Sequence, residues 1–270
     1  MKQKNIISNQ ELFFNQHSHQ EGGFKQHKIF ETYVNKEQVD GFIWLKDRRK
    51  ILDYGCGIGG SIDLMKRVLP RKKFTIYGVD IAEDALKRAS KKYPEFYFYR
   101  VKNNRIKEIK DSSMDGAYML HVLHHARGHK EIFETIYKKL DKDGMFLIND
   151  LCSQNLFNKT ARSLFIHMPK FVKNRFSDDL VVGESIPEKY KVNVEKVISD
   201  LKKVGFTIEE VGYGHLFFFL FGWIDRFVPL SRSRAVTLLY RAFIALENNL
   251  LNIKFFQNKA EVFYIKCIKK

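Results

Sequence analysis

Apolar residues in the first 150 positions of the chain follow two alternating patterns. Short apolar runs rich in β-branched and aromatic residues predict strands, and longer segments with apolar residues every three or four positions predict helices. The predicted strands cover residues 50–54, 74–79, 95–101, 114–120 and 145–150, and the predicted helices cover residues 27–46, 60–68, 82–92 and 130–140. Strands that alternate with helices of about ten residues indicate βαβ crossovers and a parallel sheet. This part of the chain therefore predicts a doubly wound α/β fold.

The pattern changes after Asp150. Residues 151–177 contain basic and aromatic side chains and no acid, which predicts a basic amphipathic helical insertion. Further along, the pattern predicts a helix at residues 194–204 and strands at residues 207–211 and 260–268. The last two strands are separated by an aromatic-rich segment, residues 215–251.

We expect two parts in the chain. Residues 1–47 form an N-terminal arm and helix, and residues 48–270 form one α/β domain. The domain carries helical insertions at about residues 152–190 and 215–256. A chain of 270 residues is long enough for one sizeable core with insertions of this kind.

The cysteines and the N-terminus indicate a cytoplasmic protein. Cys56, Cys152 and Cys267 are too few and too scattered for a disulfide framework or a metal site of the CxxC type. The first ten residues are polar and lack the apolar run of a signal peptide. We therefore expect a reducing compartment and no bound metal.

The charge of the chain is strongly basic. It has 47 Lys and Arg against 31 Asp and Glu, for a net charge of +16, and the excess is spread over both halves. Such an excess favours anionic partners or surfaces without identifying them.

The stretch ILDYGCGIGG, residues 51–60, is a predicted strand that runs into glycines. Gly55, Gly57 and Gly60 fit the G-x-G-x-x-G spacing of a dinucleotide site, whereas Gly55, Gly57 and Gly59 fit the G-x-G-x-G loop of a methyl-donor site. Both ligands need glycine here, because a backbone without Cβ can approach a ligand closely at a helix N-terminus.

Two acidic residues bear on this choice. A carboxylate at Asp53 repels a pyrophosphate, but it attracts the ammonium and sulfonium groups of S-adenosylmethionine. Asp80 ends the second predicted strand, where a carboxylate can bind ribose hydroxyls in either kind of enzyme. Asp53 therefore favours a methyl donor and disfavours a nicotinamide oxidoreductase.

Three motifs in this order resemble the class I S-adenosylmethionine-dependent methyltransferases, in particular the type 11 and ubiquinone-biosynthesis-like members. They are ILDYGCGIGGS, GVDIAEDALKRAS and SSMDGAYMLHVLHHARGHKEIFETIYKKLDKDGMFLIND, and the resemblance covers about residues 48–151. It implies a Rossmann-like doubly wound sheet of seven strands whose last strand is antiparallel. It also implies S-adenosyl-L-methionine as the cofactor.

The resemblance assigns cofactor contacts by position. The methionine part would lie against the glycine loop and the end of the fourth strand, the ribose against the second strand, and the adenine against the third. The residues are Asp53, Gly55, Cys56, Gly57, Gly59 and His121 for the methionine part, Asp80 for the ribose, and Ile81 with Asn103 or Asn104 for the adenine. Cys56 is interpreted as a small packing residue rather than a nucleophile.

The stretch MLHVLHHARGH supplies the candidate catalytic residues. Methyl transfer needs a base only when the acceptor loses a proton during attack. His121 and His125 match family positions near the methyl group, although either could instead order the loop through hydrogen bonds. A zinc site formed by these histidines is disfavoured, because no Cys or carboxylate lies at ligand spacing nearby. Asn149 and Asp150 end the fifth strand and could face the acceptor or cap the strand.

The acceptor is inferred from the aromatic segment. LFFFLFGW, residues 216–223, is too short for a transmembrane helix, which needs about 20 apolar residues. It could form a lid over an apolar pocket, an oligomer contact or a helix at a membrane interface. Nearby arginines suit anionic lipid headgroups. We favour a hydrophobic or lipid-like small-molecule acceptor, with peripheral contact to the anionic inner face of a membrane as a further option.

Two other functions stay open. A pI of about 9.6 and aromatic residues among basic ones suit an RNA or other nucleic-acid methyltransferase. Against this, the basic residues form no single stripe, and LINDLC stands where base-amine methyltransferases carry an Asn/Asp-Pro-Pro-Tyr/Phe motif. The other alternative is a partner protein that binds S-adenosylmethionine without catalysis. The sequence leaves the oligomeric state open.

Overall fold

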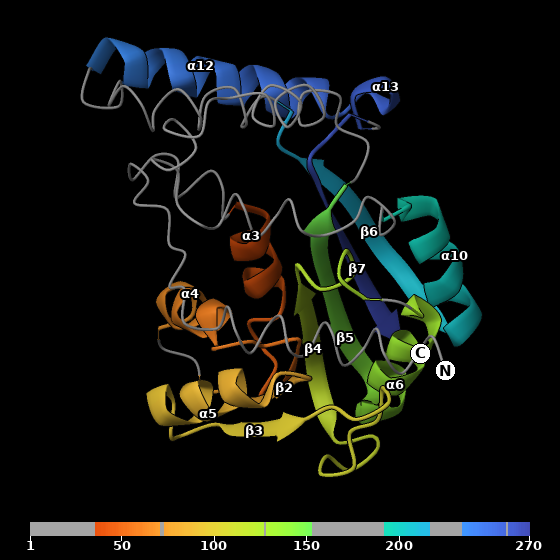
Figure 1. The fold of residues 1–270 in the computed structure, drawn as a ribbon. Helices are drawn as coiled ribbons and strands as arrows, with labels where there is room; N and C mark the ends of the chain where they lie inside the picture. The colour runs from red at the N-terminus through yellow and green to blue at the C-terminus, as the bar shows by residue number, and fades with distance from the viewer. Residues whose placement is uncertain (1–35, 71–72, 127, 153–191, 217–233, 258) are drawn as a thin grey trace, which may run out of the picture.

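A seven-stranded sheet with helices on both faces forms the framework of the protein (Figure 1). The computed structural model describes residues 36–70, 73–126, 128–152, 192–216, 234–257 and 259–270. The strands are β1 (Lys50–Tyr54), β2 (Thr75–Asp80), β3 (Tyr97–Arg100), β4 (Met114–Leu120), β5 (Leu140–Leu151), β6 (Phe206–Gly214) and β7 (Val262–Lys269).

The strand order is β3-β2-β1-β4-β5-β7-β6. The first five strands in this order are parallel, and β7 runs antiparallel to both β5 and β6. The expected doubly wound sheet with an antiparallel last strand is therefore confirmed. Because the chain turns back between β1 and β4, the carboxyl ends of these two strands border the crevice where open α/β sheets bind ligands.

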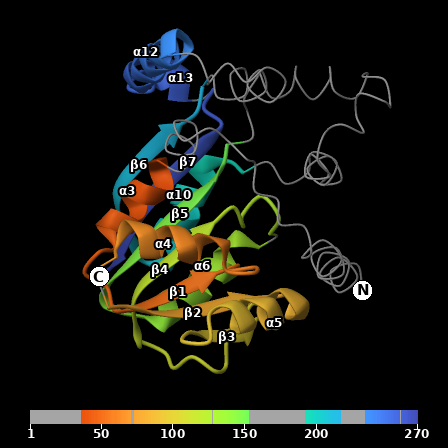
Figure 2. The ribbon, with the colours of Figure 1, turned by 90° about the vertical axis from the view of Figure 1, so that its left-hand side faces the viewer.

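The helices cover the two faces of the sheet in two groups (Figures 1 and 2). One face carries α3 (Lys36–Trp44), α4 (Gly60–Val68) and α5 (Glu83–Lys92), and the other carries α6 (His129–Lys139) and α10 (Val194–Val204). Two more helices, α12 (Arg234–Leu250) and α13 (Lys254–Gln257), lie beyond the ends of β6 and β7.

Each face of the sheet has its own apolar core. The core beneath α6 and α10 includes Phe133, Phe146 and Phe206, and the core beneath α3 and α4 includes Phe42 and Leu147. The central strands are buried on both sides, which explains why they read as nearly continuous apolar runs in the sequence.

The fifth strand begins earlier than the sequence predicts. The Asp-Gly turn at Asp143–Gly144 indicated a strand from residue 145, but β5 starts at Leu140 and pairs it with Met114. The register then shifts to pair Gly116 with Met145, and Asp143 has a left-handed φ of +62°. The turn residues therefore interrupt a longer strand locally, because buried Leu140 continues the apolar contact with β4.

Several sequence-based predictions lie outside the described residues. They are the arm and the first part of the predicted N-terminal helix, nearly all of the insertion at residues 152–190, and most of the aromatic segment at residues 216–223. The division of the chain into an arm and one domain stays a prediction.

Helix α3 packs against β4 and β5 through Phe42 and Gly41. Phe42 is fully buried, and its ring meets the Tyr118 ring edge-on at a centroid distance of 5.2 Å. Gly41 faces the side chain of Leu147 on β5, so that the helix backbone lies close to the sheet. The N-terminal side of α3 is thereby placed beside the crevice.

Removing the Phe42 side chain should loosen this packing. We expect Phe42→Ala to lower the free energy of unfolding by about 3 kcal/mol, the usual cost of emptying a buried aromatic site. The neighbouring Ile43, which is 47% exposed, supplies the control. Urea denaturation should show a much smaller loss for Ile43→Ala, and equal losses for the two variants would contradict this account of α3.

Candidate functional site

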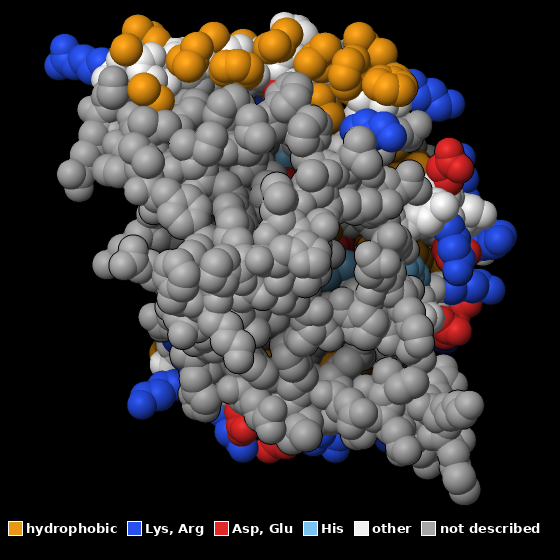
Figure 3. Space-filling model, turned by 45° about the horizontal axis from the view of Figure 1, so that its top comes forward, with side chains coloured by type: hydrophobic (Ala, Val, Ile, Leu, Met, Phe, Trp, Pro, Cys, Tyr) orange, Lys and Arg blue, Asp and Glu red, His pale blue; other side chains and the backbone are white. Residues whose placement is uncertain are grey.

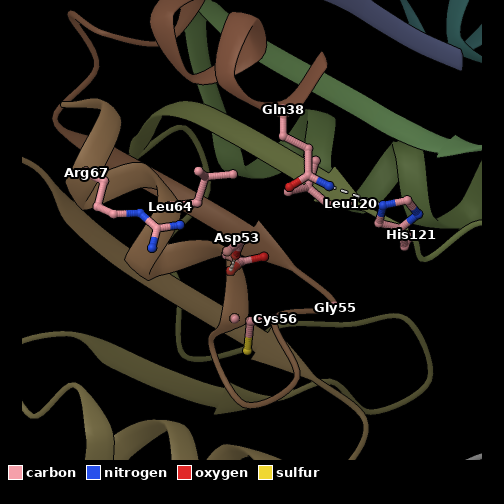
Figure 4. Close-up of a pocket in the computed structure, with 10 residues that line it drawn as sticks. Gln38, Asp53, Gly55, Cys56, Leu64, Arg67, Leu120 and His121 are labelled. Atoms are coloured by element: carbon pink, nitrogen blue, oxygen red, sulfur yellow. Dashed lines mark hydrogen bonds between the residues drawn. The ribbon is translucent and has the colours of Figure 1, made fainter. Parts of the chain in front are cut away.

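A pocket of about 270 Å³ opens at the carboxyl ends of β1 and β4 (Figure 4). Side chains and backbone from α3, β1, the glycine loop, α4 and β4 surround it. The lining residues are Gln38, Asp53, Gly55, Cys56, Gly60, Ser61, Leu64, Arg67, Leu120 and His121. Four residues that the sequence assigned to cofactor binding lie together here: Asp53, Gly55, Cys56 and His121.

The glycine loop turns sharply as it leaves β1. The N–H groups of Gly55 and Cys56 both donate to the carbonyl of Val79, at 2.7 and 3.1 Å, which draws the loop over β2. Gly55 has a left-handed φ of +79°, and a Cβ at this position would overlap the Val122 side chain. Glycine is therefore required by both backbone geometry and space. The loop then leads into α4, whose first turn borders the pocket.

Asp53 is a buried carboxylate in the wall of the pocket. Its residue is 2% exposed, and its Oδ2 accepts hydrogen bonds from Tyr118 Oη at 2.8 Å and Ser61 Oγ at 3.0 Å. Burial raises the pKa of Asp53 to about 7, although these two hydrogen bonds act in the opposite direction. A ligand that brings a positive charge next to Asp53 would favour its ionised form.

Tyr118 and Ser61 are functional neighbours that the sequence did not reveal. Tyr118 lies directly opposite Asp53 in the register of β1 and β4 and is fully buried. Burial and the nearby Asp53 raise the pKa of Tyr118, so its hydroxyl stays protonated and donates. Ser61 lies in the first turn of α4. The pairing of β1 with β4 brings the Tyr118 hydroxyl to the carboxylate, and the turn of the glycine loop into α4 brings the Ser61 hydroxyl.

Cys56 lines the pocket as a buried thiol. Burial raises the pKa of Cys56 well above its usual value, so the thiol stays protonated. A protonated thiol is a poor nucleophile. This agrees with the interpretation of Cys56 as a small packing residue, and its contact with the cofactor stays a prediction.

Asp80 ties the glycine loop to the end of β2. Its Oδ2 accepts from the Gly57 N–H at 2.8 Å, and its Oδ1 accepts from the Ala82 N–H at 2.9 Å. Burial raises the pKa of Asp80 despite these backbone donors. Gly57 and Gly59 are next to lining residues in the chain, and Asp80 is bonded to Gly57, but these three residues and Ile81 do not line the pocket. Their predicted contacts with the nucleoside stay predictions.

Asn103 and Asn104 occupy a tight turn after β3. Both have a left-handed backbone, with φ of +52° and +55°, and the turn is closed by a bridge between Lys102 and Arg105. The carbonyl of Asn104 accepts a hydrogen bond from Thr135 Oγ1 at 2.6 Å. Neither asparagine lines the pocket, so the adenine contact stays a prediction.

His121 and His125 differ in their surroundings. His121 lines the pocket, and its Nε2 lies 3.2 Å from Gln38 Nε2 on α3. Burial lowers the pKa of His125 to about 3, which keeps its ring neutral near pH 7. A lower pKa makes an imidazole ring a weaker proton acceptor. The catalytic roles of His121 and His125 stay predictions.

His124 instead forms the closest acid–histidine contact of this loop. Its Nδ1 lies 2.6 Å from Oδ1 of Asp150, a fully buried residue at the end of β5. Burial acts to raise the pKa of Asp150, but its contacts with His124, His121 and the Leu151 N–H together place this pKa below its usual value. The ionised Asp150 accepts a hydrogen bond from Nδ1 of His124, and Nε2 is the ring nitrogen that this contact does not use.

Asp150 also has a structural role, while Asn149 has no part in the pocket. Asp150 Oδ2 accepts from the Leu123 N–H at 2.6 Å, which fixes the start of the histidine loop. Asn149 is buried and donates to the carbonyl of Phe263 on β7 at 3.2 Å.

Among the residues that the structure describes, no group of three or more His, Cys, Asp or Glu side chains is arranged to hold a metal ion.

The residues of the pocket fit S-adenosylmethionine. This molecule carries an ammonium and a sulfonium. Asp53 offers a buried carboxylate, and its hydrogen-bond donors Ser61 and Tyr118 are neutral hydroxyls. The loop beside it has glycine at Gly55, where the backbone borders the pocket directly. A diphosphate at the same point would meet a like charge.

The chain is similar in sequence to known methyltransferases. Residues 52–148 match the model of the methyltransferase domain family. A 24-methylenesterol C-methyltransferase from Arabidopsis thaliana is 30% identical over 46% of this chain and 34% of its own length. A juvenile hormone acid O-methyltransferase from Bombyx mori is 23% identical over 71% of this chain and 66% of its own length.

Solved structures show the same fold. A geranyl diphosphate C-methyltransferase from Streptomyces coelicolor A3(2), in complex with S-adenosyl-L-homocysteine, has a TM-score of 0.59 at 11% identity and covers 98% of both chains. The present chain spans about a third to two thirds of the length of the curated relatives described above. Residues 52–148 thus match the methyltransferase domain family, and the described sheet has the fold of S-adenosylmethionine-dependent methyltransferases of solved structure.

Proposed function

We propose that this protein transfers a methyl group from S-adenosylmethionine to a hydrophobic or lipid-like small molecule. The observation that carries the proposal is the buried carboxylate of Asp53 in the wall of the glycine-loop pocket. The acceptor class is supported by relatives named for sterols and for juvenile hormone acid. Leu64 and Leu120 give the pocket an apolar side on which such an acceptor could pack.

The charge of Asp53 holds the methionine part of the cofactor, and hydrogen bonds to the ribose hydroxyls hold its nucleoside part. Asp53 pairs with the α-ammonium, and Tyr118 and Ser61 keep its oxygens oriented through the hydrogen bonds described above. Asp80 accepts from the ribose hydroxyls, and Ile81 packs against the adenine near Asn103 or Asn104. His121 lies beside the methionine part at the mouth of the pocket.

The transfer itself depends mainly on position. When bound, S-adenosylmethionine supplies a methyl carbon that is already activated by the sulfonium. The pocket then has to hold the acceptor atom in line with the bond that breaks. If the acceptor is a hydroxyl, its proton must leave during attack. His124, oriented by Asp150, takes this proton at Nε2 in place of His125.

Cofactor selectivity tests the role of Asp53. We expect the protein to bind S-adenosylhomocysteine and not NAD in calorimetry at pH 8, where Asp53 is ionised. Asp53→Asn keeps the shape of the side chain and removes its charge, so the affinity for S-adenosylhomocysteine should fall at least about tenfold. Cys56 lines the same pocket, and Cys56→Ala should change the affinity for S-adenosylhomocysteine less than about threefold. Binding of NAD alone, or equal effects of the two substitutions, would contradict the assignment.

The acceptor class is tested with S-adenosylmethionine that carries a radioactive methyl group. With a total lipid extract and an RNA preparation offered separately, we expect label in the organic phase and none in RNA. For a hydroxyl acceptor, His124→Gln should lower kcat about 100-fold and leave the KM for the methyl donor unchanged.

The matched control for this assay is His129→Gln. His129 begins α6 directly after this loop, and its Nε2 lies 3.0 Å from the Leu123 carbonyl instead of contacting an acid. The His129→Gln variant should keep most of the methyl-transfer activity of the unaltered protein. Label in RNA alone would overturn the lipid-like acceptor, and equal losses in the two histidine variants would remove His124 from the chemistry.

A further inference from the structure

The helices α12 and α13 carry a surface of exposed apolar side chains. Seven large hydrophobic residues are exposed among those that the structure describes, and five of them lie on or between these two helices. They are Leu238 (65% exposed), Leu239 (54%), Leu246 (48%), Ile253 (51%) and Phe255 (66%). We refer to these five residues as the α12–α13 surface. Figure 3 shows hydrophobic side chains gathered along the whole of α12 and onto α13.

The apolar residues of α12 form one stripe. Leu238, Ala242 and Leu246 follow each other at intervals of four, and Leu239 and Ala245 lie beside them. At about 100° per residue these positions span about 120° of the helix circumference. All five are exposed, so the stripe faces away from the rest of the described structure. A stripe of this width on a surface helix normally packs against something apolar.

The charges around the stripe are basic. Residues 234–259 contain four basic residues, Arg234, Arg241, Lys254 and Lys259, and a single acid, Glu247. Glu247 lies about half a turn of the helix away from Leu238 and is only 2% exposed. Arg234 and Arg241 border the stripe on one side and are exposed. The surface therefore presents apolar and positive groups without an exposed acid between them.

The α12–α13 surface is fixed to the edge of the sheet that holds the pocket. Leu216, Leu251 and Ala260 form a small buried cluster at its base. Gly214 at the end of β6 and Leu151 at the end of β5 both pair with Val262 at the start of β7. The two helices therefore extend from the same edge of the sheet as the carboxyl ends of β1 and β4.

We propose that the α12–α13 surface lies on an anionic lipid bilayer, with its leucines and Phe255 among the acyl chains and its basic residues at the headgroups. This proposal rests on the proposed function, since a lipid-like acceptor would reach the enzyme from that bilayer. No described helix is long and apolar enough to cross a membrane. An amphipathic helix in the plane of the interface matches the stripe and its basic border.

Charge favours a bilayer over a second copy of this chain as the occupant. Two copies that met through this surface would bring Arg234 and Arg241 close to another chain of net charge +16. An anionic bilayer attracts the same residues, and each basic residue near its surface adds to binding.

Sedimentation of the full chain with vesicles tests the proposal. With phosphatidylcholine vesicles that contain phosphatidylglycerol, we expect binding at low salt that weakens at least about tenfold at high salt or without the anionic lipid. The double substitution Leu238→Glu/Leu239→Glu, and separately Phe255→Glu, should each lower the partition coefficient, the first at least about tenfold. Tyr97→Glu supplies the control, because Tyr97 is 50% exposed on the distant edge strand β3. It should bind vesicles like the unaltered protein.

Three results would overturn the proposal: no sedimentation with anionic vesicles at low salt, equal losses in the α12 and Tyr97 variants, or a dimer that the double substitution dissolves while vesicle binding is unchanged. The last result would assign the surface to a second copy of the chain. Calorimetry with S-adenosylhomocysteine on the same variants separates this proposal from the proposed function, because cofactor affinity should stay within about twofold in all of them. A protein that binds vesicles but no cofactor would overturn the proposed function alone.

Discussion

The site depends on one carboxylate that the fold withdraws from water. Asp53 ends up inside the molecule because β1 runs between β2 and β4, with strand partners on both sides. Burial makes its charge costly, and two hydroxyls offset only part of that cost, so the pKa of Asp53 rises to about 7. A cationic group in the pocket removes this penalty, whereas an anionic group would increase it. The proposed selectivity for a methyl donor over a dinucleotide rests on this single electrostatic arrangement.

The rest of the fold positions partners around that carboxylate. The reversal of strand order places the end of β4 beside β1, and with it Tyr118 and His121. The glycine loop leaves β1 at the same level and is tied to β2 through Asp80. Helix α3 adds Gln38 from the opposite side of the pocket, held there by the packing of Phe42. Each contribution comes from a different segment of the chain, so the site exists only in the assembled sheet.

The sequence predicts the elements of this fold better than the contacts between them. The glycine loop, Asp53 and the strand at residues 114–120 can be recognised because each is a local pattern. Tyr118 could not be assigned, because its contact with Asp53 depends on the register of two strands that are far apart in the chain.

The histidine loop and α12 show the same limit. Three histidines lie within five positions, and the choice of His124 over His125 requires Asp150 from the neighbouring strand. The apolar pattern of α12 predicts a helix with an apolar face, but it does not tell whether that face lies inside the protein or at its surface. That distinction comes from the exposure of Leu238 and Leu246.

The release of protons on cofactor binding measures the state of Asp53 most directly. Calorimetry of S-adenosylhomocysteine in buffers of different ionisation enthalpy gives the number of protons released. Because the pKa of Asp53 is about 7 before binding and the ammonium lowers it, about 0.9 proton should be released at pH 6 and almost none at pH 8.5. The affinity should accordingly fall below pH 7. The same count of protons at both pH values, or a release at pH 6 that persists in Asp53→Asn, would contradict a buried carboxylate that ionises for its ligand.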